Sequence, residues 1–414
     1  MRNRLLFLAA LALFLLAAVP GSASAVDYVP GEVIVKYKGA AASKQLDIRD
    51  GRTVRQKVAE LRQDPDVAYV VPNYLAHASG AFYPNDPGFH RQWNLAGPFG
   101  INMPDAWGIA RARHAPGGRG AVVAVVDTGV AYRSYRRYRR APDLRRFVPG
   151  RDFVDGDRYP FDLNGHGTHV AGTIAQTTNN RLGAAGIAYR ARIMPLRVLD
   201  SEGAGDTASI AKAIRYAAKR RVDVINLSLE FDSSVRAAQI PDIVSAVRYA
   251  RARGVLVVAA AGNQADAVVA YPGRAPGVLA VAATTYNGCE ADYSNAGSDV
   301  DVSAPGGGVD APNADNTWDA SHCRPDDSGH YIYQQTFTSG IRHFGLPGGY
   351  EGTSMAAPHV SAIAALIVAT KRLGSHPSPH ALELQLEGSA RDVGPSGFDG
   401  RYGFGLVDAA AALR

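Results

Sequence analysis

The chain has 414 residues, 46% of them hydrophobic and 20% charged, which is ample for a buried core and allows two or three domains. The formal net charge is +6, but the basic excess is local, because eight arginines stand between residues 132 and 151 against Asp143 alone. Residues 78–414 carry a net charge of +3, and without this cluster the charge would be −4. The excess basicity is therefore confined to one loop and is not a general field. With tyrosines interleaved, this loop could contact nucleic acid or an anionic surface, but we interpret it as a solvated surface insertion.

Residues 1–25 have the pattern of a secretory signal. Arg2 and Arg4 precede an apolar run over residues 5–19, and Ala23-Ser24-Ala25 fits the small-residue cleavage rule. A transmembrane anchor is the alternative, but the run is shorter than the roughly 20 residues that a bilayer span needs. No other segment looks long and apolar enough, so we expect a soluble, secreted, extracellular protein, with a periplasmic location left open.

The segment over residues 27–77 predicts a strand, a helix and a second strand. A capping box formed by Thr53 and Gln56 marks the start of the helix. About fifty residues bury little surface, so this unit is expected to need a partner for stability. We therefore divide the mature chain into a small α+β unit with its linker, residues 26–80, and a main domain, residues 81–414.

The main domain alternates apolar strands with helical segments. The strands are predicted over residues 121–126, 192–198, 222–227, 255–260 and 278–283, and helices over residues 209–219 and 241–253. Near-continuous apolar runs are typical of strands that are covered on both faces. The fold class predicted is α/β, with a doubly wound, mainly parallel β-sheet flanked by helices. Ligands of such sheets bind at the carboxyl ends of the strands.

Four polar residues stand where such a site would form. Asp127 ends an apolar strand, His166 begins a helix, Asn263 follows another strand, and Ser354 begins an apolar helix. Nucleophilic hydrolysis needs a hydroxyl, an imidazole to take its proton, a carboxylate to orient the imidazole, and donors for the oxyanion. We predict Asp127, His166 and Ser354 as catalytic residues, with Asn263 and the backbone N–H of Ser354 as oxyanion donors. Each residue taken alone could equally be a loop or cap residue.

The motifs around these residues resemble those of the subtilisin-like serine proteases, the subtilase family. They are Asp127-Thr128-Gly129, His166-Gly167-Thr168-His169, Ala261-Gly262-Asn263 and Gly352-Thr353-Ser354-Met355-Ala356-Ala357-Pro358. The likeness extends from Asn85 to the end of the chain, and Pro84-Asn85-Asp86-Pro87 resembles the thermitase branch. It implies the same parallel-sheet fold and a secreted serine endopeptidase acting on proteins or peptides.

The resemblance also implies that residues 26–80 are an inhibitory propeptide, made as part of an inactive precursor that processes itself. A monomer without nucleic-acid or membrane partners is expected. A catalytically silent homologue that only binds peptides is the alternative.

The resemblance further implies a cleft that binds the substrate as an added strand. The implied substrate-binding residues are Gly203, Gly205, Ser228, Leu229, Ala260, Ala261 and Gly262. One residue departs from the family pattern, because Glu230 follows where relatives usually carry glycine. Its carboxylate could favour basic substrate side chains or could point to solvent, and we expect the second.

A structural calcium ion is the last feature that the resemblance implies. Asp86, Asp143 and Asn180 match a calcium site of relatives, and oxygen ligands from distant segments suit this hard cation. The alternative is three ordinary polar surface residues.

Two cysteines, Cys289 and Cys323, are the only ones in the chain, and a disulfide is the default expectation in a secreted protein. A zinc site with His322 and His330 is the alternative, although the spacing matches no known zinc motif. The surrounding stretch, residues 306–349, is assigned no role.

Overall fold

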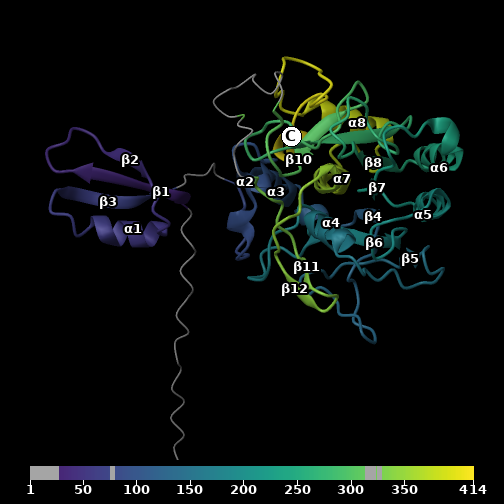
Figure 1. Ribbon diagram of the computed structural model, residues 1–414, viewed down its shortest axis with the longest axis horizontal. Coiled ribbons are helices and arrows are strands. Elements are labelled where there is room, and N and C mark those ends of the chain that lie inside the picture. Colours follow the sequence, from purple (N-terminus) through teal and green to yellow (C-terminus); the bar gives the residue numbers. More distant parts are fainter. Residues whose placement is uncertain (1–27, 75–79, 313–322, 324–328) are drawn as a thin grey trace, which may run out of the picture. The chain divides into compact units, whose positions relative to one another are not determined.

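The computed structural model describes residues 28–74, 80–312, 323 and 329–414. The chain divides into two compact units, Met1–His77 and Ala78–Arg414. Both are drawn in Figure 1. The predicted signal segment and His322 lie outside the described residues.

The smaller unit is an antiparallel three-stranded sheet in the order β2-β1-β3, with one helix. Its elements are β1 (Tyr28–Tyr37), β2 (Lys44–Asp47), α1 (Val54–Leu61) and β3 (Val67–Tyr74). The predicted capping box is confirmed, because the Thr53 side chain accepts from the Gln56 N–H and the Gln56 side chain accepts from the Thr53 N–H. Strand β2 was not predicted, since its four residues carry no alternating apolar pattern.

The larger unit is built on a seven-stranded sheet in which every neighbouring pair is parallel, in the order β10-β9-β8-β7-β4-β6-β5. The strands are β4 (Val122–Asp127), β5 (Arg151–Asp152), β6 (Arg192–Arg197), β7 (Val224–Leu227), β8 (Leu256–Ala260), β9 (Val278–Thr284) and β10 (Val302–Pro305). The predicted parallel α/β sheet is confirmed. Its two edge strands, β5 and β10, were not predicted because they are too short to show a pattern.

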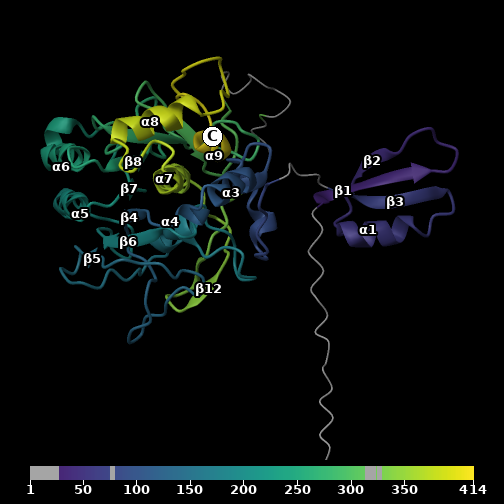
Figure 2. The same cartoon turned by 180° about the vertical axis from the view of Figure 1, so that it is seen from behind.

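Helices cover both faces of this sheet (Figures 1 and 2). On one side lie α4 (His166–Ala175) and α7 (Thr353–Thr370), and on the other lie α5 (Thr207–Lys219) and α6 (Pro241–Arg251). Alternate residues of β4 serve the two layers: Val123 and Val125 belong to the core under α4 and α7, whereas Ala124 and Val126 belong to the core under α5 and α6. This arrangement explains why the strand is apolar without interruption.

Helix α7 runs through the centre of the larger unit. Among the described residues it is the one helix long and apolar enough to cross a membrane, which the sequence reading had overlooked. Its most apolar 18-residue window is 83% buried in the protein, so its apolarity is that of a core helix.

The remaining elements complete the unit around the sheet. They are the helices α2 (Trp93–Ala96), α3 (Met103–Ala112), α8 (Pro379–Gly388) and α9 (Ala409–Leu413), short 3₁₀ turns at Phe89–Arg91, Pro116–Gly118 and Ala237–Gln239, and an antiparallel pair of strands, β11 (Thr336–Ser339) and β12 (His343–Gly345).

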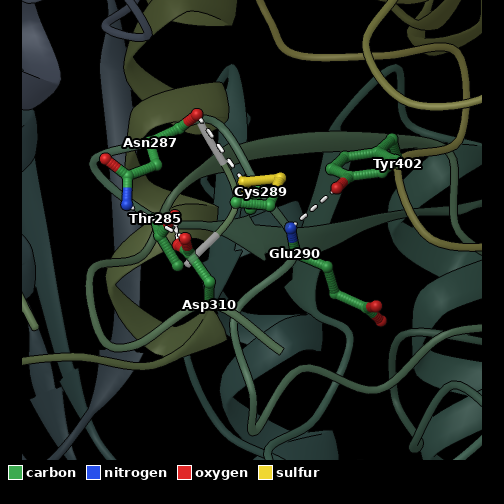
Figure 3. Close-up of a disulfide and its surroundings, with 7 residues drawn as sticks. Thr285, Asn287, Cys289, Glu290, Asp310 and Tyr402 are labelled. Atoms are coloured by element: carbon green, nitrogen blue, oxygen red, sulfur yellow. Dashed lines mark hydrogen bonds between the residues drawn. A yellow bond between two sulfur atoms is a disulfide. The ribbon is translucent and has the colours of Figure 1, made fainter. Parts of the chain in front are cut away.

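Cys289 and Cys323 form a disulfide, with their Cα atoms 5.7 Å apart. The expected pairing is confirmed, and the zinc alternative is excluded because both thiols are consumed. Figure 3 shows how the segment around Cys289 is fixed. The Asn287 side-chain amide donates to the Asp310 carboxylate at 2.9 Å, and the Glu290 N–H donates to the Tyr402 hydroxyl at 2.7 Å.

The arginine cluster forms an exposed surface over stacked tyrosines. The Tyr138 ring lies 4.0 Å from the Phe161 ring, and the Tyr135 ring lies 5.3 Å from the Tyr159 ring. The guanidinium of Arg136 lies over Tyr135 at 5.2 Å from its centroid, and the other arginines of the cluster are exposed. This geometry agrees with the interpretation as a solvated insertion.

Candidate active site

Asp127 and His166 are brought together from the end of β4 and the start of α4. Asp127 is fully buried, and its Oδ1 lies 2.8 Å from Nδ1 of His166. Because a carboxylate can only accept, Nδ1 carries the hydrogen, which leaves Nε2 as the basic atom. Burial lowers the pKa of His166, but the negative charge of Asp127 and its hydrogen bond outweigh this effect and raise the pKa above its usual 6.5. The Asp127 carboxylate therefore stabilises the protonated form of the His166 imidazole.

The start of α4 is held by a buried carboxylate that the sequence reading missed. Asp162 accepts from the N–H of Gly165 at 2.8 Å and from the N–H of Thr168 at 3.0 Å. An aspartate shortly before a helix is a typical capping signal and could have been recognised. The position after His166 must be glycine, because a Cβ on Gly167 would lie 2.1 Å from the carbonyl oxygen of Gly129.

Ser354 is the second residue of α7 and is half-buried. Its hydroxyl donates to the carbonyl oxygen of Ser228 at 3.3 Å, while the Ser228 hydroxyl donates to the Ser354 carbonyl at 2.7 Å. Within the described part of the chain, no hydrogen bond joins Ser354 Oγ to His166, and the Ser354 N–H donates to no protein group. That N–H lies at the positive end of the helix dipole.

Asn263 is fixed against the start of α7 by its amide oxygen. Asn263 Oδ1 accepts from the N–H of Thr353 at 2.8 Å and from the Thr353 hydroxyl at 2.9 Å. Since both oxygen lone pairs are used, the exposed part of the side chain is the donor Nδ2. The adjacent Gly352 has φ 138°, a conformation that other residues rarely adopt. The orienting role of Thr353 was not predicted.

The expectation that Glu230 points to solvent is met only in part, because its side chain contacts Asn263 through a hydrogen bond that is exposed. The residue is half-buried, and its Oε2 accepts from Asn263 Nδ2 at 3.4 Å. Burial raises the pKa of the Glu230 carboxyl above its usual range, although the backbone and side-chain amides of Asn263 partly oppose the shift. The carboxylate thus lies over the residue predicted to stabilise the oxyanion.

Two of the predicted substrate-binding residues, Gly203 and Gly205, lie in a loop tied to the start of α4. Leu199 pairs with Gly205, and a Cβ on Gly205 would lie 2.4 Å from the Val198 carbonyl oxygen. The Asn164 side chain donates to the Ser201 carbonyl at 2.9 Å and accepts from the His166 N–H at 3.1 Å.

The segments carrying the other predicted substrate residues meet at Thr353 and Ser354. Gly262 donates its N–H to the Thr353 hydroxyl at 3.2 Å, and Ala260 and Ala261 before it are fully buried. Ser228 contacts Ser354 as described above, and Leu229 is buried beside it. The structure thus gathers these residues near Ser354, and their binding of substrate stays a prediction.

Asp86, Asp143 and Asn180 also converge, as predicted for a calcium site. Asp86 accepts from the N–H groups of Asn179 and Asn180 at 2.6 and 2.8 Å, and Asp143 accepts from the Asn180 side-chain amide at 2.6 Å. Gln176, which was not predicted, donates to the other Asp143 oxygen at 2.9 Å. Both carboxylates are buried.

This group has the chemistry that a hard cation requires. Burial, with a smaller contribution from the charge of Asp86, raises the pKa of Asp143 to about 7. In the described residues neither carboxylate has an ion-pair partner, and no cluster of three or more His, Cys, Asp or Glu side chains is found. The two carboxylates offer oxygen ligands of the kind that Ca²⁺ prefers, whereas the amide oxygens of Asn180 and Gln176 accept from the N–H groups of Leu182 and Gln335 at 3.0 Å and would have to give up these bonds to join them.

The chain is similar in sequence and in fold to known serine proteases. The chain is 36% identical over 368 residues to a thermophilic serine proteinase of Bacillus sp. (strain AK1), covering 83% of this chain and 79% of that protein. It is 39% identical over 297 residues to thermitase of Thermoactinomyces vulgaris, covering 71% and 88%. Among solved structures, a protease from Pseudoalteromonas arctica PAMC 21717 superimposes with a TM-score of 0.63 at 34% identity, covering 80% of this chain and 98% of that one. Residues 118–405 match the sequence model of the subtilase family, and the chain therefore belongs to this family of serine proteases.

Proposed function

We propose that this chain is a secreted serine endopeptidase in which Ser354 is the nucleophile, His166 the general base and Asp127 the residue that orients it. The observation that carries the proposal is the 2.8 Å hydrogen bond between the buried Asp127 carboxylate and His166 Nδ1, which leaves Nε2 as a base. The same contact would stabilise the imidazolium that forms when His166 Nε2 takes the serine proton.

The reaction begins with a rotation of one hydroxyl. Ser354 Oγ exchanges its long, 3.3 Å bond to the Ser228 carbonyl for one to His166 Nε2, as catalytic hydrogen bonds often tighten when substrate binds. Oγ then attacks the peptide carbonyl while Nε2 takes its proton. The proton passes from Nε2 to the leaving amine, and water releases the acyl group by the same route in reverse.

The oxyanion of the intermediate has two donors. Asn263 Nδ2 faces away from Thr353 because its own oxygen is held there, and the Ser354 N–H is free at the start of α7. Preorganised donors of this kind supply roughly 3–4 kcal/mol each to the stabilisation of the transition state.

The smaller unit is proposed as the inhibitory propeptide of an inactive precursor that Ser354 cleaves. Over residues 28–74 of this unit the buried hydrophobic core consists of five valines, so the core is small. Tyr69 and Tyr74 of β3 are 46% and 54% exposed and would be available to a partner surface. Secretion is proposed from the signal-like residues 1–25.

We also propose that Asp86, Asp143 and Asn180 hold a structural Ca²⁺. Two buried carboxylates without an ion-pair partner in the described chain support this assignment. The ion would supply the positive charge that lets both carboxylates be buried in ionised form.

The test of the function is Ser354→Ala against Ser201→Ala, which alters an exposed serine of the 199–205 loop. The first change should lower casein hydrolysis by about a millionfold, a magnitude known for subtilisin, and leave the precursor uncleaved. The second should leave both unchanged. A fluorophosphonate probe should label the peptide containing Ser354 in the parent enzyme only.

A catalytically silent peptide-binding homologue would show neither hydrolysis nor labelling. Hydrolysis by purified Ser354→Ala protein at the parent rate would refute the assignment of the nucleophile.

A further inference from the structure

Glu230 occupies an unusual position for a negative charge. It stands two residues after Ser228, whose carbonyl receives the Ser354 hydroxyl, and its carboxylate crosses to the segment after β8. There it contacts Asn263, through the side-chain amide at 3.4 Å and through the backbone N–H. The side chain therefore spans the two segments that carry the predicted substrate-binding residues Ser228, Leu229 and Ala260 to Gly262, between which the resemblance implies a specificity pocket beside Ser354.

The Glu230 carboxylate has no positively charged partner among the residues that the structure describes. Within the described residues it forms no ion pair, and the Asn263 amides are its only hydrogen-bond donors. Arg274 contacts the segment that follows Glu230, but its guanidinium does not pair with the Glu230 carboxylate. It donates to the carbonyl oxygens of Ser233 and Val235 and lies over the Tyr271 ring. An ionised carboxylate has about four acceptor sites, so Glu230 keeps free ones.

The negative charge of Glu230 is energetically unfavourable at this position. Partial burial disfavours its charge, and the same charge opposes the negative oxyanion that would form at Asn263 Nδ2. A cation bound to Glu230 would relieve both effects. The described walls of the site, Leu229, Ala260 and Ala261, are apolar and buried and provide no such cation.

We propose that Glu230 is a specificity-determining residue that binds a lysine or arginine side chain of the substrate, on the residue that supplies the scissile carbonyl. This inference rests on the proposed endopeptidase function. An ammonium or guanidinium group would donate hydrogen bonds to the free lone pairs of the carboxylate, and its positive charge would cancel the repulsion between the carboxylate and the oxyanion. The enzyme would then prefer to cleave after basic residues, although apolar walls surround the pocket.

A second role for the same side chain is purely steric. By spanning the two segments, Glu230 could narrow the pocket and exclude large substrate side chains without any contribution from its charge. Replacement by glutamine keeps the size and the contact with Asn263 and removes the charge, whereas replacement by glycine removes all three. The two variants therefore separate charge from bulk.

The experiment measures kcat/KM on quenched fluorescent peptides that differ only in the residue before the scissile bond, which is Lys, Arg, Met or Leu. The active enzyme is compared with Glu230→Gln, Glu230→Gly and the control Asp232→Asn, whose exposed carboxylate interacts with Ser234. In the parent enzyme we expect Lys and Arg to exceed Met. Because a hydrogen bond to a charged group is strong, the Lys/Met ratio should fall by about tenfold or more in both Glu230 variants and stay constant in the control.

The outcomes separate the inference from the function beneath it. An active parent enzyme without a basic preference, or a Glu230→Gln variant that keeps the parent ratio, overturns the role of Glu230 and leaves the endopeptidase assignment standing. A gain on Leu and Met in Glu230→Gly alone would assign the steric role instead. A parent enzyme that cleaves no peptide and takes no fluorophosphonate label would overturn both.

Discussion

Removal of calcium should lower the thermal stability of this enzyme, and replacement of Asp143 should remove that response. Asp86 and Asp143 are buried side by side with amides as their only described partners. A cation between them would let both remain ionised. The ion would also join three distant parts of the larger unit: the segment of Asp86, the segment after β4, and the loop after α4.

The size of the effect follows from two estimates. A ligand that binds only the folded state stabilises it by about 4 kcal/mol at a thousand times its dissociation constant. Unfolding about 340 residues has an entropy of roughly 0.7 kcal/mol per degree, so the midpoint of unfolding should fall by about 6 °C when calcium is removed.

The variant Asp143→Asn makes the prediction sharper. Since burial raises the folded-state pKa of Asp143 to about 7 from 3.8, its ionised form costs about 4 kcal/mol without a cation. Because the pKa of Asp143 is higher in the folded state than in the unfolded state, the loss of stability is absent below about pH 4, grows as the pH rises, and is complete above pH 7. At pH 8 the variant should therefore unfold above the chelated parent enzyme, and its unfolding midpoint should be the same with and without chelator.

The assay is scanning fluorimetry of enzyme inactivated by a covalent serine reagent, so that self-digestion does not contribute. Each protein is measured at pH 8 with excess calcium and with EDTA. Asp232→Asn, which alters an exposed aspartate, should respond as the parent does. A difference below about 2 °C in the parent enzyme, or an equal response of Asp143→Asn, would show that these residues hold no stabilising ion.

Four further predictions concern the site and its surroundings. Asn263→Ala should lower kcat by roughly 10²–10³-fold, a magnitude known from a subtilisin, and change KM little; a loss confined to KM would contradict its role as an oxyanion donor. Because the pKa of His166 is raised and only its neutral form accepts the serine proton, kcat/KM should rise with pH through a midpoint above 6.5; a midpoint below 6 would contradict the dominance of the Asp127 charge. Residues 28–77 added as a separate polypeptide should inhibit the mature enzyme, and no inhibition at roughly tens of micromolar would count against a propeptide role. Reduction of the Cys289–Cys323 disulfide, which closes a separation of 34 residues, should cost roughly 3–4 kcal/mol and lower the unfolding midpoint by about 5 °C, and an unchanged midpoint would show that this loop is constrained by other contacts.

The sheet could be predicted because its central strands are covered on both faces and are therefore apolar throughout. The five strands predicted from such runs are β4 and β6 to β9, each found within two residues of its expected ends. The strands that were missed, β2, β5, β10, β11 and β12, have two to four residues each. Such short strands are defined by their neighbours in the sheet, and no local pattern announces them.

The site could be predicted only as far as its chemistry is visible in single residues. Asp127, His166, Asn263 and Ser354 have side chains that suggest roles, whereas the groups that orient them are ordinary polar residues. Asn226 is an example: it is buried within β7, donates to the Ser228 hydroxyl at 2.9 Å and accepts from the Ser361 hydroxyl at 2.8 Å. An asparagine inside an otherwise apolar strand was a signal that could have been read, because buried polar groups need partners.

The environment of the Glu230 side chain could not be predicted from the local sequence. Its side chain contacts Asn263, which lies 33 positions later and follows β8, the strand that pairs with β7. A glutamate in a loop is usually solvated, which is why the sequence favoured exposure. In the folded chain the same residue is a half-buried negative charge beside a site where negative charge must form, and within the described residues the protein supplies no cation to balance it. A positive charge that the described residues do not supply can come from the substrate. We therefore expect Glu230, the residue that departs from the family pattern, to determine the specificity of this enzyme.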